Sequence, residues 1–102
     1  MRKILIRTAT LEETDKGEEK TFSLNYYLLI ENLGETSKMQ TFGVMITKTY
    51  ERKNSHLNEK SVASDLFIEE SKALKFIETL CKCTVTPMTL SYIIDDMLGV
   101  CI

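Results

Sequence analysis

Apolar and polar residues alternate most regularly between Thr21 and Glu31. Every second position in this stretch is apolar, and the positions are Phe22, Leu24, Tyr26, Leu28 and Ile30. Because successive side chains of a β-strand point to opposite faces, the pattern gives one fully apolar face and one mixed face. It predicts a central strand over about 20–31, in an antiparallel sheet that packs one side on a core.

Three further segments show the same period of two. They predict a first strand over about 2–12, a third over 39–51 and a weaker fourth over 61–68. The groups expected to share a face are Ile4 with Ile6, Leu5 with Ala9 and Leu11, Phe42 with Val44 and Ile46, and Val62 with Leu66 and Ile68.

Polar segments and glycines separate these strands. Gly17 and Gly34 lie in polar stretches and predict turns, where Gly17 is free to adopt a positive φ. Residues 52–60 are polar and predict a loop. Gly43 instead lies inside the third strand, where a glycine often marks a bulge or a close approach of two backbones.

The hydrophobic period changes to 3.6 in the last third of the chain. The spacing of Ala73, Ile77 and Leu80 predicts an amphipathic helix over about 70–83, with Phe76 and Cys81 on the same stripe. A second helix is predicted over about 87–98. Its apolar stripe is Leu90, Ile93, Ile94, Met97 and Leu98. Thr86 precedes Pro87, so Thr86 suits an N-cap and Pro87 the first helical position.

These elements predict an α+β fold, in which a four-stranded antiparallel meander is followed by two helices packed on one face of the sheet. The alternative is a curled half-barrel that the two helices plug. A length of 102 residues fits one domain over 1–102 with one hydrophobic core.

Charge and hydropathy argue against several classes of partner. The net charge is −2, from 13 Lys and Arg against 15 Asp and Glu, whereas nucleic-acid binding usually needs a basic surface. No apolar stretch approaches the roughly 18 residues of a membrane span. Arg7 ends the first apolar run after three residues, so we expect no export signal. Three cysteines cannot all pair within the chain, and we expect reduced thiols in the cytoplasm.

Several short motifs, in order and spacing, resemble those of a known family. They are Tyr26-Tyr27-Leu28-Leu29-x-Glu31, Phe42-Gly43-Val44-x-Ile46-x-Lys48, Val85-Thr86-Pro87-x-x-Leu90 and Asp95-Asp96-x-Leu98. The chain resembles, over about 22–98, a family of short clostridial and related Firmicutes proteins, catalogued as a domain of unknown function. The resemblance implies a bacterial cytosolic domain, and it brings no activity, cofactor or catalytic residue. Phe42 departs from the Tyr expected in the family, and this change removes a hydroxyl.

Few residue groupings suggest chemistry. Cys81 and Cys83 form a C-x-C pair, but Cys101 is distant and the single histidine, His56, lies in a loop. A zinc site needs four ligands, and a catalytic cysteine needs an adjacent base, so we expect no metal, no cofactor and no catalytic site. Asp95-Asp96 opposes the dipole in the second helix and could bind a cation or a basic surface. We favour pairing within the fold, or solvation, for these two carboxylates.

The second face of the predicted sheet carries more apolar residues than is usual for a solvent-exposed face. The residues expected there are Leu5, Tyr27, Leu29, Met45 and Phe67. Large apolar patches usually mark interfaces, so the first hypothesis is a non-catalytic interaction or regulatory module that self-associates, or binds another protein, through this face.

Two other hypotheses concern ligands and catalysis. The alternative function is small-ligand binding in a pocket between sheet and helices, lined by Tyr26, Phe42, Tyr50 or Tyr92. The third and least favoured hypothesis is an enzyme that uses a cysteine or the Asp95-Asp96 pair.

Overall fold

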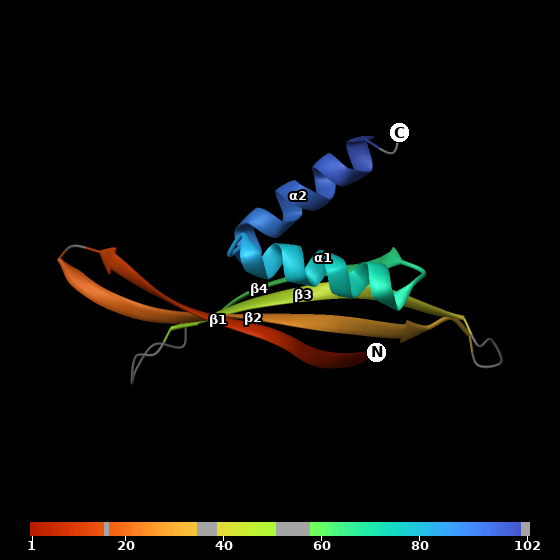
Figure 1. Ribbon diagram of the computed structural model, residues 1–102, viewed down its shortest axis with the longest axis horizontal. Coiled ribbons are helices and arrows are strands. Elements are labelled where there is room, and N and C mark those ends of the chain that lie inside the picture. The colour runs from red at the N-terminus through yellow and green to blue at the C-terminus, as the bar shows by residue number, and fades with distance from the viewer. Residues whose placement is uncertain (16, 35–38, 51–57, 101–102) are drawn as a thin grey trace.

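The computed structural model describes residues 1–15, 17–34, 39–50 and 58–100. Four antiparallel strands form one sheet in the order β1-β2-β3-β4, and two helices follow (Figure 1). The elements are β1 (Arg2–Asp15), β2 (Glu18–Asn32), β3 (Gln40–Tyr50), β4 (Asn58–Phe67), α1 (Glu70–Lys82) and α2 (Pro87–Val100). Figure 1 shows both helices on the same side of the sheet. The predicted α+β class, the meander and the two helices on one face are confirmed.

The hairpin of β1 and β2 is longer than the apolar pattern predicts. The two strands pair as far as Asp15 and Glu18, and Gly17 adopts the expected positive φ of 80° in the turn. The added pairs join mostly charged and threonine residues. An alternation of apolar side chains cannot reveal such pairs, because none of them reaches a core.

A bulge interrupts β1. Leu5 is opposite Tyr27 and Arg7 is opposite Tyr26, so Ile6 has no partner residue in β2. An extra residue reverses the alternation of the strand. The expectation that Ala9 and Leu11 share a face with Leu5 is therefore wrong, since both pack with Ile6 against the core on the side of the helices.

A second bulge lies in β4. Phe42 is opposite Phe67 and Val44 is opposite Ala63, so three residues of β4, 64–66, face Gly43 alone. A Cβ atom on Gly43 would overlap the carbonyl oxygen of Ala63 and lie 2.9 Å from Cα of Ser64. The close backbone approach predicted for Gly43 is thus confirmed.

This bulge also changes which residues of β4 share a face. Val62 is opposite Met45, and it lies on the face away from the helices. Leu66 packs against the core, whereas Ile68 is 75% exposed. The predicted grouping of Val62, Leu66 and Ile68 on one face is wrong, because Leu66 lies inside the bulge, where the alternation is interrupted, and Ile68 follows the end of β4.

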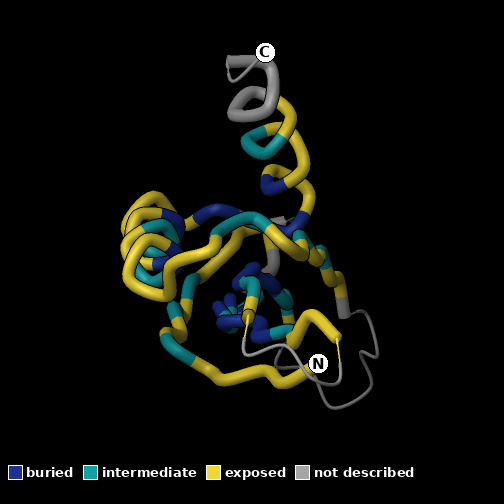
Figure 2. The backbone as a smooth tube through the Cα atoms, turned by 90° about the vertical axis from the view of Figure 1, so that its right-hand side faces the viewer, coloured by how far each residue is buried: buried dark blue, intermediate teal, exposed yellow. Residues whose placement is uncertain are grey.

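The core lies between the helix-facing side of the sheet, called the helix face below, and α1. Its buried residues are Phe22, Leu24, Tyr26, Leu28, Ile30, Phe42, Val44, Ile46, Ala73, Ile77, Leu80, Val85 and Leu90. These include the whole alternating set of β2 and three residues of the α1 stripe. In Figure 2 the buried positions of α1 face the strands, and α2 points away from the sheet. Ile93 and Ile94 of α2 still pack against the core.

The turn between the helices is compact. Thr84 adopts a positive φ of 47°, and the Val85 N–H donates to the Leu80 carbonyl at 3.0 Å. Such a left-handed residue after a helix usually is glycine, and its hydrogen bonds satisfy carbonyls at the helix end. Pro87 is the first residue of α2, as predicted, and the Leu90 N–H donates to the Thr86 carbonyl at 3.1 Å.

Candidate functional site

The sheet face opposite the helices, called the second face below, carries one row of apolar residues across all four strands. Leu5 is opposite Tyr27, Tyr27 is opposite Met45, and Met45 is opposite Val62. We call these four residues the apolar row. Leu29 lies two residues along β2 from Tyr27 and on the same face.

How far the side chains of the apolar row and Leu29 are exposed depends on whether their strand is an outer or an inner strand of the sheet. Leu5 and Val62 lie on the outer strands and are 52% and 46% exposed. Met45 and Leu29 lie on the inner strands and are only 6% and 3% exposed. Tyr27 is half-buried, and the Lys3 ammonium lies 5.5 Å from the centre of its ring. The two ends of the row therefore offer most of the apolar surface.

A hydrogen-bonded polar row runs beside the apolar row. Thr8 Oγ1 donates to Asn25 Oδ1 at 3.0 Å, and Asn25 Nδ2 donates to Thr47 Oγ1 at 3.2 Å. Lys60 is opposite Thr47 and completes this row on β4. Because these side chains bond to one another, the polar row forms an ordered border to the apolar row.

The structure places four of the five predicted interface residues together. Leu5, Tyr27, Leu29 and Met45 share the second face, but Phe67 does not. Phe67 lies on the helix face, where its ring centre is 5.6 Å from that of Phe76 in α1. The prediction takes the phase of β4 from Leu66, which lies in the bulge and packs on the core, so it places both Phe67 and Val62 on the wrong face. That these residues form an interface stays a prediction.

The four aromatic residues predicted to line a pocket lie apart. Tyr26 is buried in the core, and its hydroxyl donates to the Val85 carbonyl at 3.0 Å. Tyr50 packs on Phe22 at a distance of 6.0 Å between ring centres. Tyr92 is exposed on α2, and Phe42 borders a shallow hollow beside Ile68 and Glu70. Within the described residues they do not enclose one cavity.

The buried hydroxyl of Tyr26 makes stability depend on alkaline pH. Burial, with smaller contributions from the Cys81 and Cys83 thiols, raises the pKa of Tyr26 from 10.0 to about 12. In the unfolded chain the phenol loses its proton near pH 10, whereas the folded chain keeps it. The contribution of this group to folding is therefore complete below pH 10 and is lost as the pH rises through about 12.

Tyr26→Phe should remove this contribution and lower the free energy of unfolding by about 1–3 kcal/mol at neutral pH, because the Val85 carbonyl loses its donor. Urea unfolding at neutral pH and between pH 9 and pH 12 measures both effects. Tyr92→Phe, at an exposed tyrosine, is the matched control and should keep the wild-type pH dependence. An unchanged alkaline slope in Tyr26→Phe would contradict the assignment.

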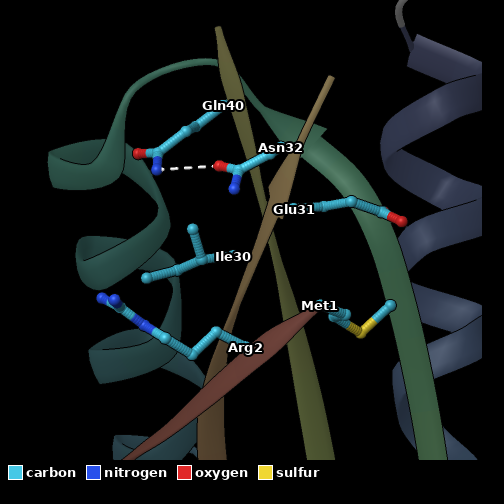
Figure 3. A pocket seen from close by; sticks show the side chains of 6 residues that line it. All are labelled: Met1, Arg2, Ile30, Glu31, Asn32 and Gln40. Carbon is cyan, nitrogen blue, oxygen red and sulfur yellow. Dashed lines mark hydrogen bonds between the residues drawn. The ribbon is translucent and has the colours of Figure 1, made fainter. Parts of the chain in front are cut away.

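Figure 3 shows a hollow at the end of the sheet beside the first residues of the chain. Arg2 and Ile30 point to one side of the strands, and Glu31 points to the other. Gln40 Nε2 donates to Asn32 Oδ1 at 3.0 Å. The lining side chains diverge around the strand ends, so the hollow has no set of polar groups that converge on one point.

The residues considered for chemistry are dispersed in the described part of the chain. Cys81 is half-buried against the core, and Cys83 is exposed just after α1. Among the described residues, no three or more His, Cys, Asp or Glu side chains lie together as metal ligands would. Asp95 is exposed. His56, Cys101 and the side chain of Asp96 lie outside the described residues. No helix in the described ranges is long and apolar enough to cross a membrane.

The fold and the second face together define a small α+β protein with a sheet of four strands, two helices on one face and an apolar row on the face opposite the helices. Residues 3–100 match a family of unknown function, DUF6514, and the chain belongs to this family. No curated protein and no solved structure matches the chain. Membership of a family of unknown function agrees with the resemblance found in the sequence, whose taxonomic part stays a prediction.

Proposed function

We propose that this protein is a non-catalytic interaction module that associates with a second copy of itself through the second face. The apolar row is the observation that carries this proposal. Its two ends, Leu5 and Val62, are about half exposed on a face that no helix of the described chain covers. Exposed apolar side chains gain free energy when a partner removes them from water, and here two such residues flank the less exposed Tyr27 and Met45.

The arrangement of the row suits a second copy. When two second faces stack about a two-fold axis parallel to the strands, β1 of one copy lies over β4 of the other. Leu5 then faces Val62 of the second copy, and Tyr27 faces Met45. Such an isologous contact needs a surface that is complementary to itself, and the row meets this requirement.

Charges beside the row agree with the same stacking. Lys3 lies on β1 two residues before Leu5, and Asp65 lies in the β4 bulge beyond Val62. The stacking that brings Leu5 over Val62 therefore brings Lys3 near Asp65 of the second copy. Asp65 also accepts a hydrogen bond from Thr41, which orients its carboxylate. Complementary charges of this kind mainly set orientation and specificity.

A ligand-binding function has less support. The Tyr26 hydroxyl already has a partner in the Val85 carbonyl, and the other candidate residues lie apart. A ligand site would need an enclosed cavity with a few converging polar groups. We therefore favour the interaction module over the ligand-binding hypothesis.

Val62→Glu tests the proposal, because it places a carboxylate at an exposed end of the apolar row. We expect the wild-type mass, measured by light scattering, to rise with concentration above the 11.7-kDa monomer. Val62→Glu should weaken this association about ten-fold or more, since the charge would lose water in the contact. Thr49→Glu adds the same charge to the exposed polar part of the same face and is the matched control.

The comparison has a clear contrary outcome. If Val62→Glu and wild type associate equally, or if Thr49→Glu weakens association as much, the apolar row is not the contact surface. Circular dichroism of each variant confirms that the fold is retained, and both positions are on strands where an exposed side chain is replaced.

A further inference from the structure

The two edges of the sheet differ in how well they are protected from pairing with another strand. The edge strand β4 is interrupted by the bulge at 64–66, and Asp65 there has a φ of +56°. The beginning of α2 also packs beside β4. The edge strand β1 is 14 residues long and contains no proline. Bulges and covering helices protect strand edges. The bulge of β1 inserts a single residue, Ile6, without a left-handed residue, so β1 is the more open of the two.

Charges along β1 have opposite signs at its two ends. Arg2 and Lys3 lie at its start, and Glu12 and Glu13 lie near its end. All four side chains are exposed. When a strand pairs with its own copy in the antiparallel direction, the start of each strand lies beside the end of the other. Antiparallel self-pairing of β1 therefore brings opposite charges together, whereas parallel pairing brings like charges together.

The bulge in β1 gives this pairing a consistent register. Residues that are directly opposite in a sheet must point to the same face. Lys3 and Glu12 both lie on the second face, since they are opposite Leu29 and Thr21 of β2. An uninterrupted strand would put residues 3 and 12 on opposite faces, and the extra residue Ile6 brings them to the same one.

The same register holds along the rest of the strand. With Ile6 and Arg7 sharing one position, as they do against β2, equal numbers of positions flank Thr8 on both sides. A two-fold axis at Thr8 then pairs residues of matching face and complementary character. The pairs are Arg2 with Glu13, Lys3 with Glu12, Ile4 with Leu11, and Leu5 with Thr10.

We propose that β1 pairs antiparallel with β1 of a second copy about a two-fold axis at Thr8, which joins the two four-stranded sheets into one continuous sheet. This contact goes beyond the proposed function, because it uses the strand edge and not the second face. Its axis is perpendicular to the sheet, so the second faces of both copies lie on the same side. The opposite charges at each end favour this antiparallel register, and the like charges that parallel pairing would bring together oppose the parallel direction.

Reversing the charge of Lys3 or Glu12 tests the pairing of β1 with its copy. Both side chains are exposed, so the substitutions leave the core packing unchanged. All proteins in this experiment carry Val62→Glu, so association through the second face does not contribute. We expect this background protein to be a dimer by sedimentation velocity. Adding Lys3→Glu, or separately Glu12→Lys, should weaken the dimer about ten-fold or more, because each change places like charges opposite each other twice.

Mixing the two reversed variants is the decisive step. In a mixed dimer each reversed residue lies opposite a residue of the other sign, so an equimolar mixture should form a one-to-one dimer at concentrations where each variant alone is a monomer. Light scattering with one protein carrying a mass tag identifies the mixed species. No association in the mixture would overturn the proposal, as would a background protein that is a monomer at hundreds of micromolar.

Hydrogen exchange identifies the strand that is buried. In the background protein, amides of residues 2–13 should exchange more slowly as the concentration rises, while amides at the edge of β4 should not change. Protection at β4 instead of β1 would also overturn the pairing. Neither result depends on the second face, whose role is judged separately by comparing Val62→Glu with wild type.

Discussion

Replacing Gly43 by alanine should lower the free energy of unfolding by about 3 kcal/mol or more. The new Cβ would overlap the Ala63 carbonyl oxygen and lie 2.9 Å from Cα of Ser64. Both contacts are with backbone, which cannot move aside as the end of a flexible side chain can. The β4 bulge would have to shift, and with it the pairing of Phe42 with Phe67. Urea unfolding followed by circular dichroism measures the change.

Gly17→Ala is the matched control for this prediction. Gly17 also lies next to strands of the sheet, but nothing lies within 4 Å of a Cβ placed there. Only its positive φ of 80° opposes alanine, and this strain costs about 1–2 kcal/mol. A loss at Gly43 no larger than that at Gly17 would show that the contact between β3 and β4 is looser than described.

Ile77→Ala should lower the free energy of unfolding by about 2–5 kcal/mol. Ile77 is fully buried in the middle of the α1 stripe and belongs to the core between α1 and the sheet. Its truncation removes apolar contacts and leaves a cavity that a rigid sheet cannot close. The expected result is a lower midpoint in urea with an unchanged slope, because the folded structure stays compact.

Ile68→Ala removes the same atoms at a position that is 75% exposed, just before α1. Its effect should be within about 0.5 kcal/mol, as for most surface substitutions. Similar losses for Ile77→Ala and Ile68→Ala would contradict the placement of the α1 stripe against the sheet. The pair therefore tests directly which face of α1 packs against the sheet.

The sequence predicts the layer and its cover well because both depend on long, regular patterns. The alternation from Phe22 to Ile30 places β2, and the stripe of Ala73, Ile77 and Leu80 places α1. Residues of one pattern all face the same way, so a single irregular position does not disturb the prediction. Gly43 could be interpreted as well, because glycine inside a strand has few structural reasons to be there.

The two bulges account for the errors. In β1 one extra residue reverses the alternation, so every later position is assigned to the wrong face. In β4 two extra residues keep the alternation, but Leu66 inside the bulge packs on the core and gives a misleading phase for the whole strand. In β1 the change of phase is visible afterwards, because apolar positions are even at Ile4 and Ile6 but odd at Ala9 and Leu11. In β4 the left-handed Asp65 gives no comparable signal.

The candidate site was only partly predictable for the same reason. The common face of four residues was predicted because none of them lies on β4, the strand with the second bulge. They are Leu5, Tyr27, Leu29 and Met45. Phe67 and Val62 were both placed on the wrong face, because the phase of β4 was taken from Leu66, which lies inside the bulge and packs on the core. Tyr26 was assigned to a pocket because the sequence cannot show that Val85 would supply its hydrogen-bond partner.

The far end of the β1–β2 hairpin has a consequence for how the protein opens. Within the described residues, pairing with β3 reaches Phe22, and residues 12–15 and 18–21 form a two-stranded ribbon beyond it. A ribbon without a third strand is marginally stable by itself, and it can fray while the rest of the sheet stays intact. Glu12 and Glu13 lie in this ribbon. Pairing of Arg2 and Lys3 from another copy with these two residues would therefore also stabilise the ribbon. Assembly and the ordering of the tip would then be thermodynamically linked.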